Sequence, residues 1–379
     1  MKQITKKYIV PHLPSLICGI LFCVLIVLPT GYEDAVIYQE TDRCRAEVVE
    51  TDESAVISSG LIRSGEQYCT VRLLGGIFKG QETEAYNMLS GSLESDKIYA
   101  VGDIAQVVIS YQDGQILSVN MIDHYRIDKE VILMLIYSVV LVVFARKIGL
   151  KSLLSFAIAI LSIWKILVPA CLNGKDPIFL GLAVVMMLTV VIISLVYGYD
   201  RRFLAASSGV MLGVITTCIL GIIFTDLFKI HGAIMTNSES LLYAGYEHLR
   251  LTDIFMASIF IGASGAIMDI AVDITSAVNE VVEKKPDISV KEAIMSGIHV
   301  GRAAMGTMTT TLLLAYSGGY LALLMVFMAQ GTPIYNILNY KYVAAEILDT
   351  IVGSFGLVAV APFTAFMSGI LLAKKSDKT

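Results

Sequence analysis

The chain has 379 residues, of which 56% are apolar and 16% are charged, with a formal net charge of −5. This composition excludes an ordinary soluble protein, because apolar runs of about 20 residues have no use in water, whereas a helix satisfies its own backbone polar groups in hydrocarbon. Nucleic-acid binding is also excluded, since the most polar stretch, residues 31–129, carries 17 acidic residues against 8 Lys and Arg.

The N-terminus combines a basic segment, Met1–Lys7, with the apolar run Ile9–Pro29. This pattern could be a signal peptide. However, the run is long, it contains Pro11 and Pro14, and no Ala-x-Ala-like cleavage site follows it. We therefore expect residues 1–30 to form a retained first transmembrane helix.

Residues 31–129 are predicted to form a β-rich domain, because β-favouring residues recur there in rough alternation. The best local signal is an Asp-Gly pair between two alternating apolar runs, since it supplies the positive φ values of a type I′ hairpin turn. We expect a small barrel of about five or six strands, OB-like in size. The segments concerned are Cys44–Glu50, Gln67–Leu74, and the hairpin Asp103–Ile109, Asp113-Gly114 and Gln115–Met121.

Two of the six cysteines, Cys44 and Cys69, lie in this domain. They could form a disulfide if the domain is outside the cytoplasm. The other four lie in or beside apolar runs, where a cysteine is usually a small packing residue. The sequence has no Cys/His spacing typical of a zinc site, so no metal and no cofactor is expected.

Seven further apolar runs follow within residues 130–373, which predicts a seven-helix transmembrane domain and eight spans in all. Fourteen Lys and Arg lie in the segments on the N-terminal side of the membrane and four in the short segments on the other side. This bias predicts that both termini are cytoplasmic, residues 374–379 as a short tail, and that residues 31–129 are extracytoplasmic. The runs are Val131–Ala145, Leu153–Leu172, Ile178–Tyr197, Phe203–Thr225, Ile254–Val282, His299–Gln330 and Val343–Ala373.

Two segments have no simple course. Residues 226–252 are mixed in polarity and could lie along the outer surface. The run His299–Gln330 is too long for a perpendicular helix, and Ser317-Gly318-Gly319 interrupts it. It could be tilted, broken, or a span followed by a re-entrant piece, which leaves the path of residues 317–342 open.

The run Ile254–Val282 carries acidic residues within an apolar helix. Small and acidic residues recur there at steps of three or four, so they share one helix face. A carboxylate near mid-membrane costs about 2.5–3.5 kcal/mol on insertion scales, which implies a polar cavity, protonation, a bound cation or a basic partner. The alternative is a structural contact between helices. The residues of this face are Gly262, Gly265, Asp269, Asp273, Ser276, Glu280 and Glu283.

The next run supplies residues that could face these acids. In an antiparallel arrangement Arg302 would lie within about a turn of Asp273, although it could instead snorkel to the inner surface. Gly306, Thr309 and Thr310 permit close packing of the helices or line a cavity between them. Two further acids, Glu346 and Asp349, open the last span and suit the helix dipole there.

The whole chain resembles the YibE/F family of bacterial membrane proteins. The resemblance implies a multi-span protein of the bacterial cell membrane with this exposed domain, and it implies no established activity. The matching segments are Val71–Gly91, Val101–Val107, His124–Arg126, Gly262–Val281, Gly301–Leu321 and Ala344–Pro362.

Residues 265–319 are also similar in layout to one helix hairpin of RND-type transporters. In that hairpin a Gly-containing helix with intramembrane acids leads through a short basic loop to a Thr/Gly-rich return helix. The resemblance implies proton coupling through Asp269 and Asp273. The smaller outer domain, and eight spans in place of six or twelve, depart from that pattern.

Two functions follow as hypotheses. The first is a secondary transporter of unknown substrate, coupled to a proton or small cation, with Asp269, Asp273 and Arg302 as the coupling site. The second is a non-transporting membrane component whose extracytoplasmic barrel binds a partner protein or ligand. An enzyme is not expected, because the sequence has no phosphate loop, Ser-His-Asp arrangement or metal cluster. The expected surroundings are the lipid bilayer and no nucleic acid.

Overall fold

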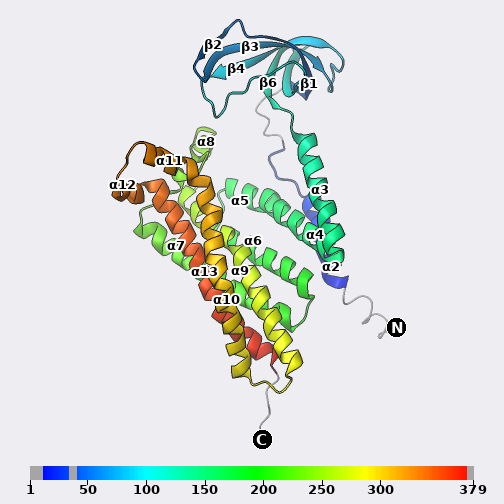
Figure 1. The fold of residues 1–379 in the computed structure, drawn as a ribbon. Coiled ribbons are helices and arrows are strands. Elements are labelled where there is room, and N and C mark those ends of the chain that lie inside the picture. The colour runs from blue at the N-terminus through cyan, green and yellow to red at the C-terminus, as the bar shows by residue number, and fades with distance from the viewer. Residues whose placement is uncertain (1–11, 34–40, 374–379) are drawn as a thin grey trace, which may run out of the picture. The chain divides into compact units, whose positions relative to one another are not determined.

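The computed structural model describes residues 12–33 and 41–373 (Figure 1). The chain divides into two compact units, residues 33–143 and residues 1–32 together with 144–379. Each unit has its own hydrophobic core.

The first unit contains a closed five-stranded barrel with one added strand. β1 pairs with both β3 and β5, so the sheet closes in the order β1-β5-β6-β4-β3-β1, and the short β2 extends β3 as a hairpin. Neighbouring strands are antiparallel except β4 and β6, which pair in parallel at Tyr86 and Asn120. The small barrel predicted after the first helix is thus confirmed. The strands are β1 Thr41–Asp52, β2 Val56–Ser59, β3 Ile62–Leu73, β4 Glu82–Ser90, β5 Ile104–Gln112 and β6 Gln115–His124.

Alternation of side chains explains why these residues form strands. On β3, Cys69, Val71 and Leu73 are buried, whereas Thr70 and Arg72 between them are more exposed. Between β5 and β6, Asp113 and Gly114 have φ values of 52° and 77°. Two successive positive φ values are what a type I′ turn requires, so the predicted hairpin is confirmed.

The barrel does not contain the disulfide considered for Cys44 and Cys69, which are both free thiols. Cys44 of β1 lies opposite Val107 on β5, whereas Cys69 of β3 lies opposite Thr51 at the far end of β1. Cys44 and Thr51 are seven residues apart, or about 23 Å at ~3.3 Å per strand residue. A disulfide needs Cα atoms within about 7 Å, so the strand register corrects this expectation.

In its described residues the second unit has six helical stretches that are long and apolar enough to cross a membrane, which makes the chain a multi-pass membrane protein. Two of the six are interrupted by segments of other helix types. The stretches are Lys147–Leu172 (α4 Lys147–Ser162, the π-helix η2 Ile163–Leu167 and α5 Val168–Leu172), α6 Pro177–Tyr197, α7 Arg201–Leu227, α9 Leu251–Lys284, Val290–Ala329 (α10 Val290–Ser317, the 3₁₀ turn η4 Gly318–Tyr320 and α11 Leu321–Ala329) and α13 Lys341–Leu372.

The first two of the eight expected spans are too short or too charged, over their described residues, to be counted with these six. α2, Leu13–Val27, is described over 15 residues, and residues 1–11 of the predicted first span lie outside the described part of the chain. α3, Ile127–Ala145, carries the charged residues Asp128, Lys129 and Glu130 in its first turn. Length and composition in the described chain therefore support six spans rather than eight.

α13 packs against α7, α9 and α10, and α9 packs in addition against α6, so α9 and α13 together form the centre of the helical unit (Figure 1). Small residues allow this close approach. On α10, Gly297 lies against Ala365 of α13, and Gly301 lies against Ala361. On α9, the face toward α7 and α13 is fully buried, and it includes Ile267. These contacts fix which face of α9 and α10 remains outside the core.

The long seventh run is a broken helix, as one of the three sequence interpretations held. α10 ends at Ser317, Gly318–Tyr320 form a single 3₁₀ turn, and α11 continues from Leu321. Short helices fill the two segments whose course the sequence left open. They are η3 Gly232–Ile234 and α8 Ser238–Tyr243 between α7 and α9, and α12 Ile334–Asn339 before α13.

Candidate functional site

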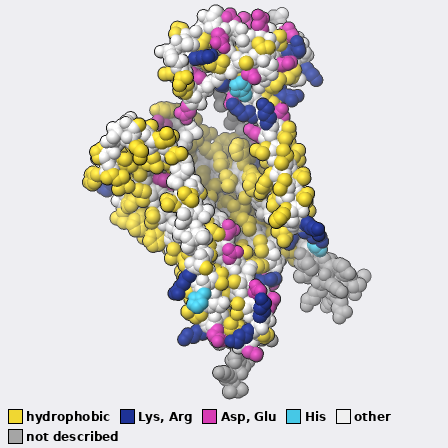
Figure 2. Space-filling model, in the orientation of Figure 1, with side chains coloured by type: hydrophobic (Ala, Val, Ile, Leu, Met, Phe, Trp, Pro, Cys, Tyr) yellow, Lys and Arg dark blue, Asp and Glu magenta, His cyan; other side chains and the backbone are white. Residues whose placement is uncertain are grey.

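The small and acidic face of α9 lies on the surface of the helical unit. We call its residues Gly262, Gly265, Asp269, Asp273 and Ser276 the acidic stripe. All five are exposed, whereas the positions between them are mostly buried, as the helical period requires. Acidic side chains are visible among small and apolar ones where α9 and α10 face the viewer (Figure 2).

Two tyrosines border the acidic stripe, one toward each end. The hydroxyl of Tyr197, at the end of α6, lies 2.6 Å from the backbone oxygen of Val272 and 2.6 Å from the Oγ of Ser276. The hydroxyl of Tyr316, near the end of α10, lies directly over Gly262, where any side chain would meet it. The stripe is therefore a shallow surface strip between α6 and α10.

The aspartates of the stripe have no protein partner within the described residues. Neither Asp269 nor Asp273 takes part in a hydrogen bond or an ion pair there. No group of three or more His, Cys, Asp and Glu that could hold a metal ion occurs in the same residues. Two carboxyl groups thus stand unpaired on a membrane-length apolar helix.

Arg302 lies at the level of Asp273 but does not pair with it. Gly301 contacts Ile274 across the α9–α10 interface, which places Arg302 beside the level of Asp273 as the sequence predicted. Arg302 is exposed, however, and the described residues contain no ion pair between it and either aspartate. Arg302 and Asp273 thus lie at the same depth along their helices but form no ion pair.

The remaining predicted positions on α10 fall into two kinds. Gly306 has open space where a side chain would be, and so does Gly265 of the acidic stripe. Thr309 donates its hydroxyl proton to the backbone oxygen of Met305 at 3.0 Å, while Thr310 is exposed. Neither glycine is therefore needed for close helix packing, which Gly297 and Gly301 provide instead.

A second acid pair, Glu346 and Asp349 of α13, was assigned to the helix dipole from the sequence. α13 begins at Lys341, so Asp349 lies more than two turns into the helix, beyond the dipole's reach. One carboxyl oxygen of each acid is buried without a hydrogen-bond partner. Tyr316 is close enough to interact electrostatically with both acids. The depth of Asp349 in α13 could have been inferred only from the start of that helix, which Tyr340 and the preceding short helix define.

Glu346 also lines a small cavity beside the break in α10. The cavity has a volume of about 200 Å³, and its other polar residues are Ser317, Tyr320 and Thr350. The rest of the lining is apolar, from α10, α11 and α13. Through Tyr316, this region adjoins the Gly262 end of the acidic stripe.

Comparison with known proteins identifies a family for the helical unit. A model of the YibE/F-like protein family matches residues 133–374, which include α9, α10 and α13. No curated protein and no solved structure matches the chain.

Proposed function

This chain belongs to the YibE/F-like protein family, and we propose that it is a secondary transporter, coupled to protons or small cations, rather than an enzyme. The proposal rests on Asp269 and Asp273, two carboxyl groups on the exposed face of α9 that have no partner among the described residues. A carboxylate facing hydrocarbon costs about 2.5–3.5 kcal/mol on insertion scales, so each group must lose its charge or acquire a counter-charge. Binding a proton removes the charge, and binding a small cation supplies the counter-charge.

The second acid pair supports the same function. Glu346 and Asp349 interact with Tyr316, and Tyr316 lies over Gly262 of the acidic stripe. Gly262 and Asp269 are seven residues apart, or about 10 Å along the helix. We propose that the two acid pairs exchange protons when water enters the stripe, with Tyr316 between them and with Ser276 and Tyr197 at the other end.

We further propose the full topology that the sequence suggests. α2 and α3 complete eight spans, because most apolar side chains of α3 are exposed and none is buried. The excess of Lys and Arg then places both termini in the cytoplasm and the barrel outside it. The barrel is assigned to the OB type, since five strands close it with one parallel pair among antiparallel ones.

The test is reconstitution of the full chain into liposomes with a pH-sensitive dye inside, while a panel of ions and solutes is applied. We expect a solute-dependent proton or cation flux that is lost when Asp269→Asn and Asp273→Asn are combined. Glu280→Gln is the matched control, because Glu280 is an exposed acid of the same helix, but it is paired with Lys284 at 2.6 Å, whereas Asp269 and Asp273 are unpaired among the described residues.

The two outcomes separate the hypotheses. Transport that persists in the double variant would show that the acidic stripe is not the coupling site. If no flux appears with any applied solute, the helices act only as an anchor, and the barrel becomes the functional part of the protein.

A further inference from the structure

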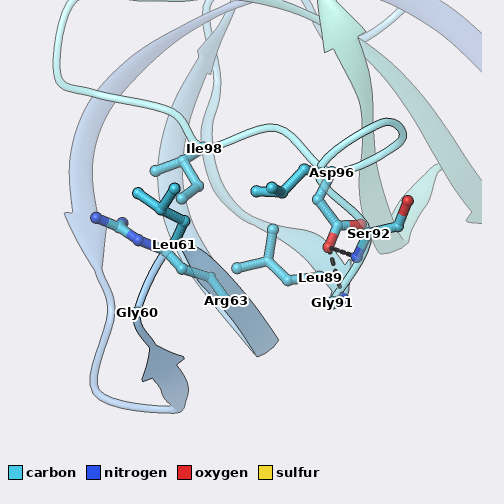
Figure 3. Close-up of a pocket in the computed structure, with 9 residues that line it drawn as sticks. Gly60, Leu61, Arg63, Leu89, Gly91, Ser92, Asp96 and Ile98 are labelled. Atoms are coloured by element: carbon cyan, nitrogen blue, oxygen red, sulfur yellow. Dashed lines mark hydrogen bonds between the residues drawn. The ribbon is translucent and has the colours of Figure 1, made fainter. Parts of the chain in front are cut away.

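One end of the barrel carries apolar side chains that the barrel core does not use. Leu61, at the tip of the β2–β3 hairpin, is 84% exposed, and Leu93, in the loop after β4, is 69% exposed. Together with Ile98 they line a hollow of about 290 Å³ whose inner wall includes the buried Leu89; Leu61, Leu89 and Ile98 are labelled in Figure 3. Ile62, which is 47% exposed, lies beside Gly91 at the same end of the barrel. We call these four exposed or half-exposed residues the apolar rim.

The loop that presents the rim is held firmly. Asp96 accepts hydrogen bonds from the backbone N–H groups of Ser90, Gly91 and Ser92 at 3.0, 2.7 and 3.0 Å, two of which Figure 3 marks. It also accepts one from the Ser90 hydroxyl at 2.8 Å. The loop therefore cannot fold Leu93 inward without losing these bonds.

Two buried amide side chains hold the other side of the same loop through hydrogen bonds. Asn87 donates to the backbone oxygen of Lys97 at 2.6 Å and to the side chain of Gln67 at 3.0 Å. Gln67 in turn donates to the backbone oxygen of Tyr99 and accepts from its N–H. The fully buried amides thus fix Ile98 between two anchored residues, with its side chain at the hollow.

Strand pairing shows which end of the barrel carries the rim. β4 and β6 run parallel with Tyr86 beside Asn120. Four residues later the strands reach Ser90 and His124, so the loop after β4 lies at the end where β6 leaves the barrel. Ser64 pairs with Ser90, which places the β2–β3 hairpin at that end too. The Asp113-Gly114 turn lies at the opposite end.

The chain leaves this end directly into α3, which begins only three residues after His124. The first apolar residue beyond the charged turn is Val131. Three extended residues at ~3.3 Å and four helical residues at ~1.5 Å separate His124 from Val131 by about 16 Å at most. The headgroup layer on each side of the hydrocarbon is about 5–7 Å thick. The rim end of the barrel thus lies at or just above the headgroups of the membrane that α3 enters.

We propose that the apolar rim docks on this membrane surface, with Leu61 and Leu93 inserted at the boundary between headgroups and acyl chains. The chemistry suits a lipid surface: exposed aliphatic side chains enter the boundary, and the neighbouring cation Lys97 meets a lipid phosphate, whereas Arg63 is paired with Glu53 at 3.3 Å. The inference rests on the proposed span α3, and it is independent of the coupling role of the acidic stripe.

The test places single tryptophans in the full chain, reconstituted in phosphatidylcholine vesicles whose acyl chains are brominated near the headgroup. The natural Trp164 is first removed as Trp164→Phe. We expect Leu93→Trp to emit at shorter wavelength than a hydrated tryptophan and to lose most of its emission to the brominated lipid. Leu117→Trp is the matched control, because Leu117 is 65% exposed near the opposite end of the barrel. It should keep its emission.

A third variant separates failure of the inference from failure of the proposed topology. The substitution Tyr137→Trp places a tryptophan in the middle of α3, and quenching of that tryptophan reports whether the helix is in the membrane. If Tyr137→Trp is quenched and Leu93→Trp is not, the rim does not touch lipid and the inference is overturned. If neither is quenched, α3 is not a span and both proposals fall. A Leu93→Trp that is shielded from aqueous iodide but not quenched by lipid would indicate a protein partner and would also overturn the inference.

Discussion

Asp96 organises the loop after β4, and its ionisation makes that loop sensitive to acid. The backbone N–H groups of Ser90, Gly91 and Ser92 stabilise the carboxylate and lower the pKa of Asp96 to about 2. Because the folded pKa lies below the ordinary value of about 3.9, this stabilisation is complete above pH ~4 and is lost as the pH falls toward 2. We expect amide protection in residues 90–98 to decrease over that window.

Hydrogen exchange followed by mass spectrometry, corrected for intrinsic rates, measures this effect. Asp96→Asn should show weak protection at both ends of the window, because the amide offers no charge to these donors. A wild-type loop that keeps full protection at pH 2 would contradict the role given to Asp96.

Single residues also show where sequence reasoning succeeds. Asp113 and Gly114 were correctly predicted as a turn because a type I′ turn depends only on two adjacent residues. The pairing of Cys44 depends on which strand lies beside β1, and no local pattern contains that information. Asp349 was misjudged for a similar reason, since its depth in α13 depends on where that helix starts.

At the scale of a helix, close packing depends on glycines at particular positions of α10. A Cβ on Gly297 would lie 2.9 Å from the Cβ of Ala365, whereas a Cβ on Gly306 would meet nothing within 4 Å. We expect Gly297→Ala to destabilise the protein by about 1–3 kcal/mol through overpacking. Gly306→Ala, the matched control on the same helix, should stabilise it by up to about 1 kcal/mol through helix propensity.

Thermal unfolding of the detergent-solubilised protein, followed by the circular dichroism of its helices, measures both variants. Equal transition temperatures for the two would mean that α10 does not pack on α13 through Gly297. The sequence predicts either close packing or a cavity at Gly306, because spacing alone identifies a helix face but not the neighbour that covers it.

At the scale of the whole molecule, the prediction concerns which side of the membrane each part occupies. We expect alkaline phosphatase fused after Lys129 to be active, and a fluorescent protein fused at the C-terminus to fold and fluoresce in the cytoplasm. An even number of spans requires both results together. A dark C-terminal fusion beside an active phosphatase fusion would leave an odd number and remove α2 or α3 from the set of spans.

Membrane character was predictable because each apolar run is contiguous in the chain and can be recognised alone. The arrangement of those runs was not, since burial of Ile267 and exposure of Asp269 on the same helix depend on four neighbours, α6, α7, α10 and α13. The helical face was correctly predicted, but whether that face lies inside or outside the unit could not be.

The double pairing of β1 has a consequence for biosynthesis. β1 needs β5 as well as β3 to complete its hydrogen bonds, and its contacts with β5 join residues about 60 positions apart, from Glu47 with Ile104 to Thr41 with Ser110. Closure also needs β6, which joins β5 to β4, so the barrel cannot close until His124 has left the ribosome, by which time most or all of α3 has been made. Long-range closure of this kind is slow. We therefore expect the barrel to finish folding only after the chain beyond it has begun to be made.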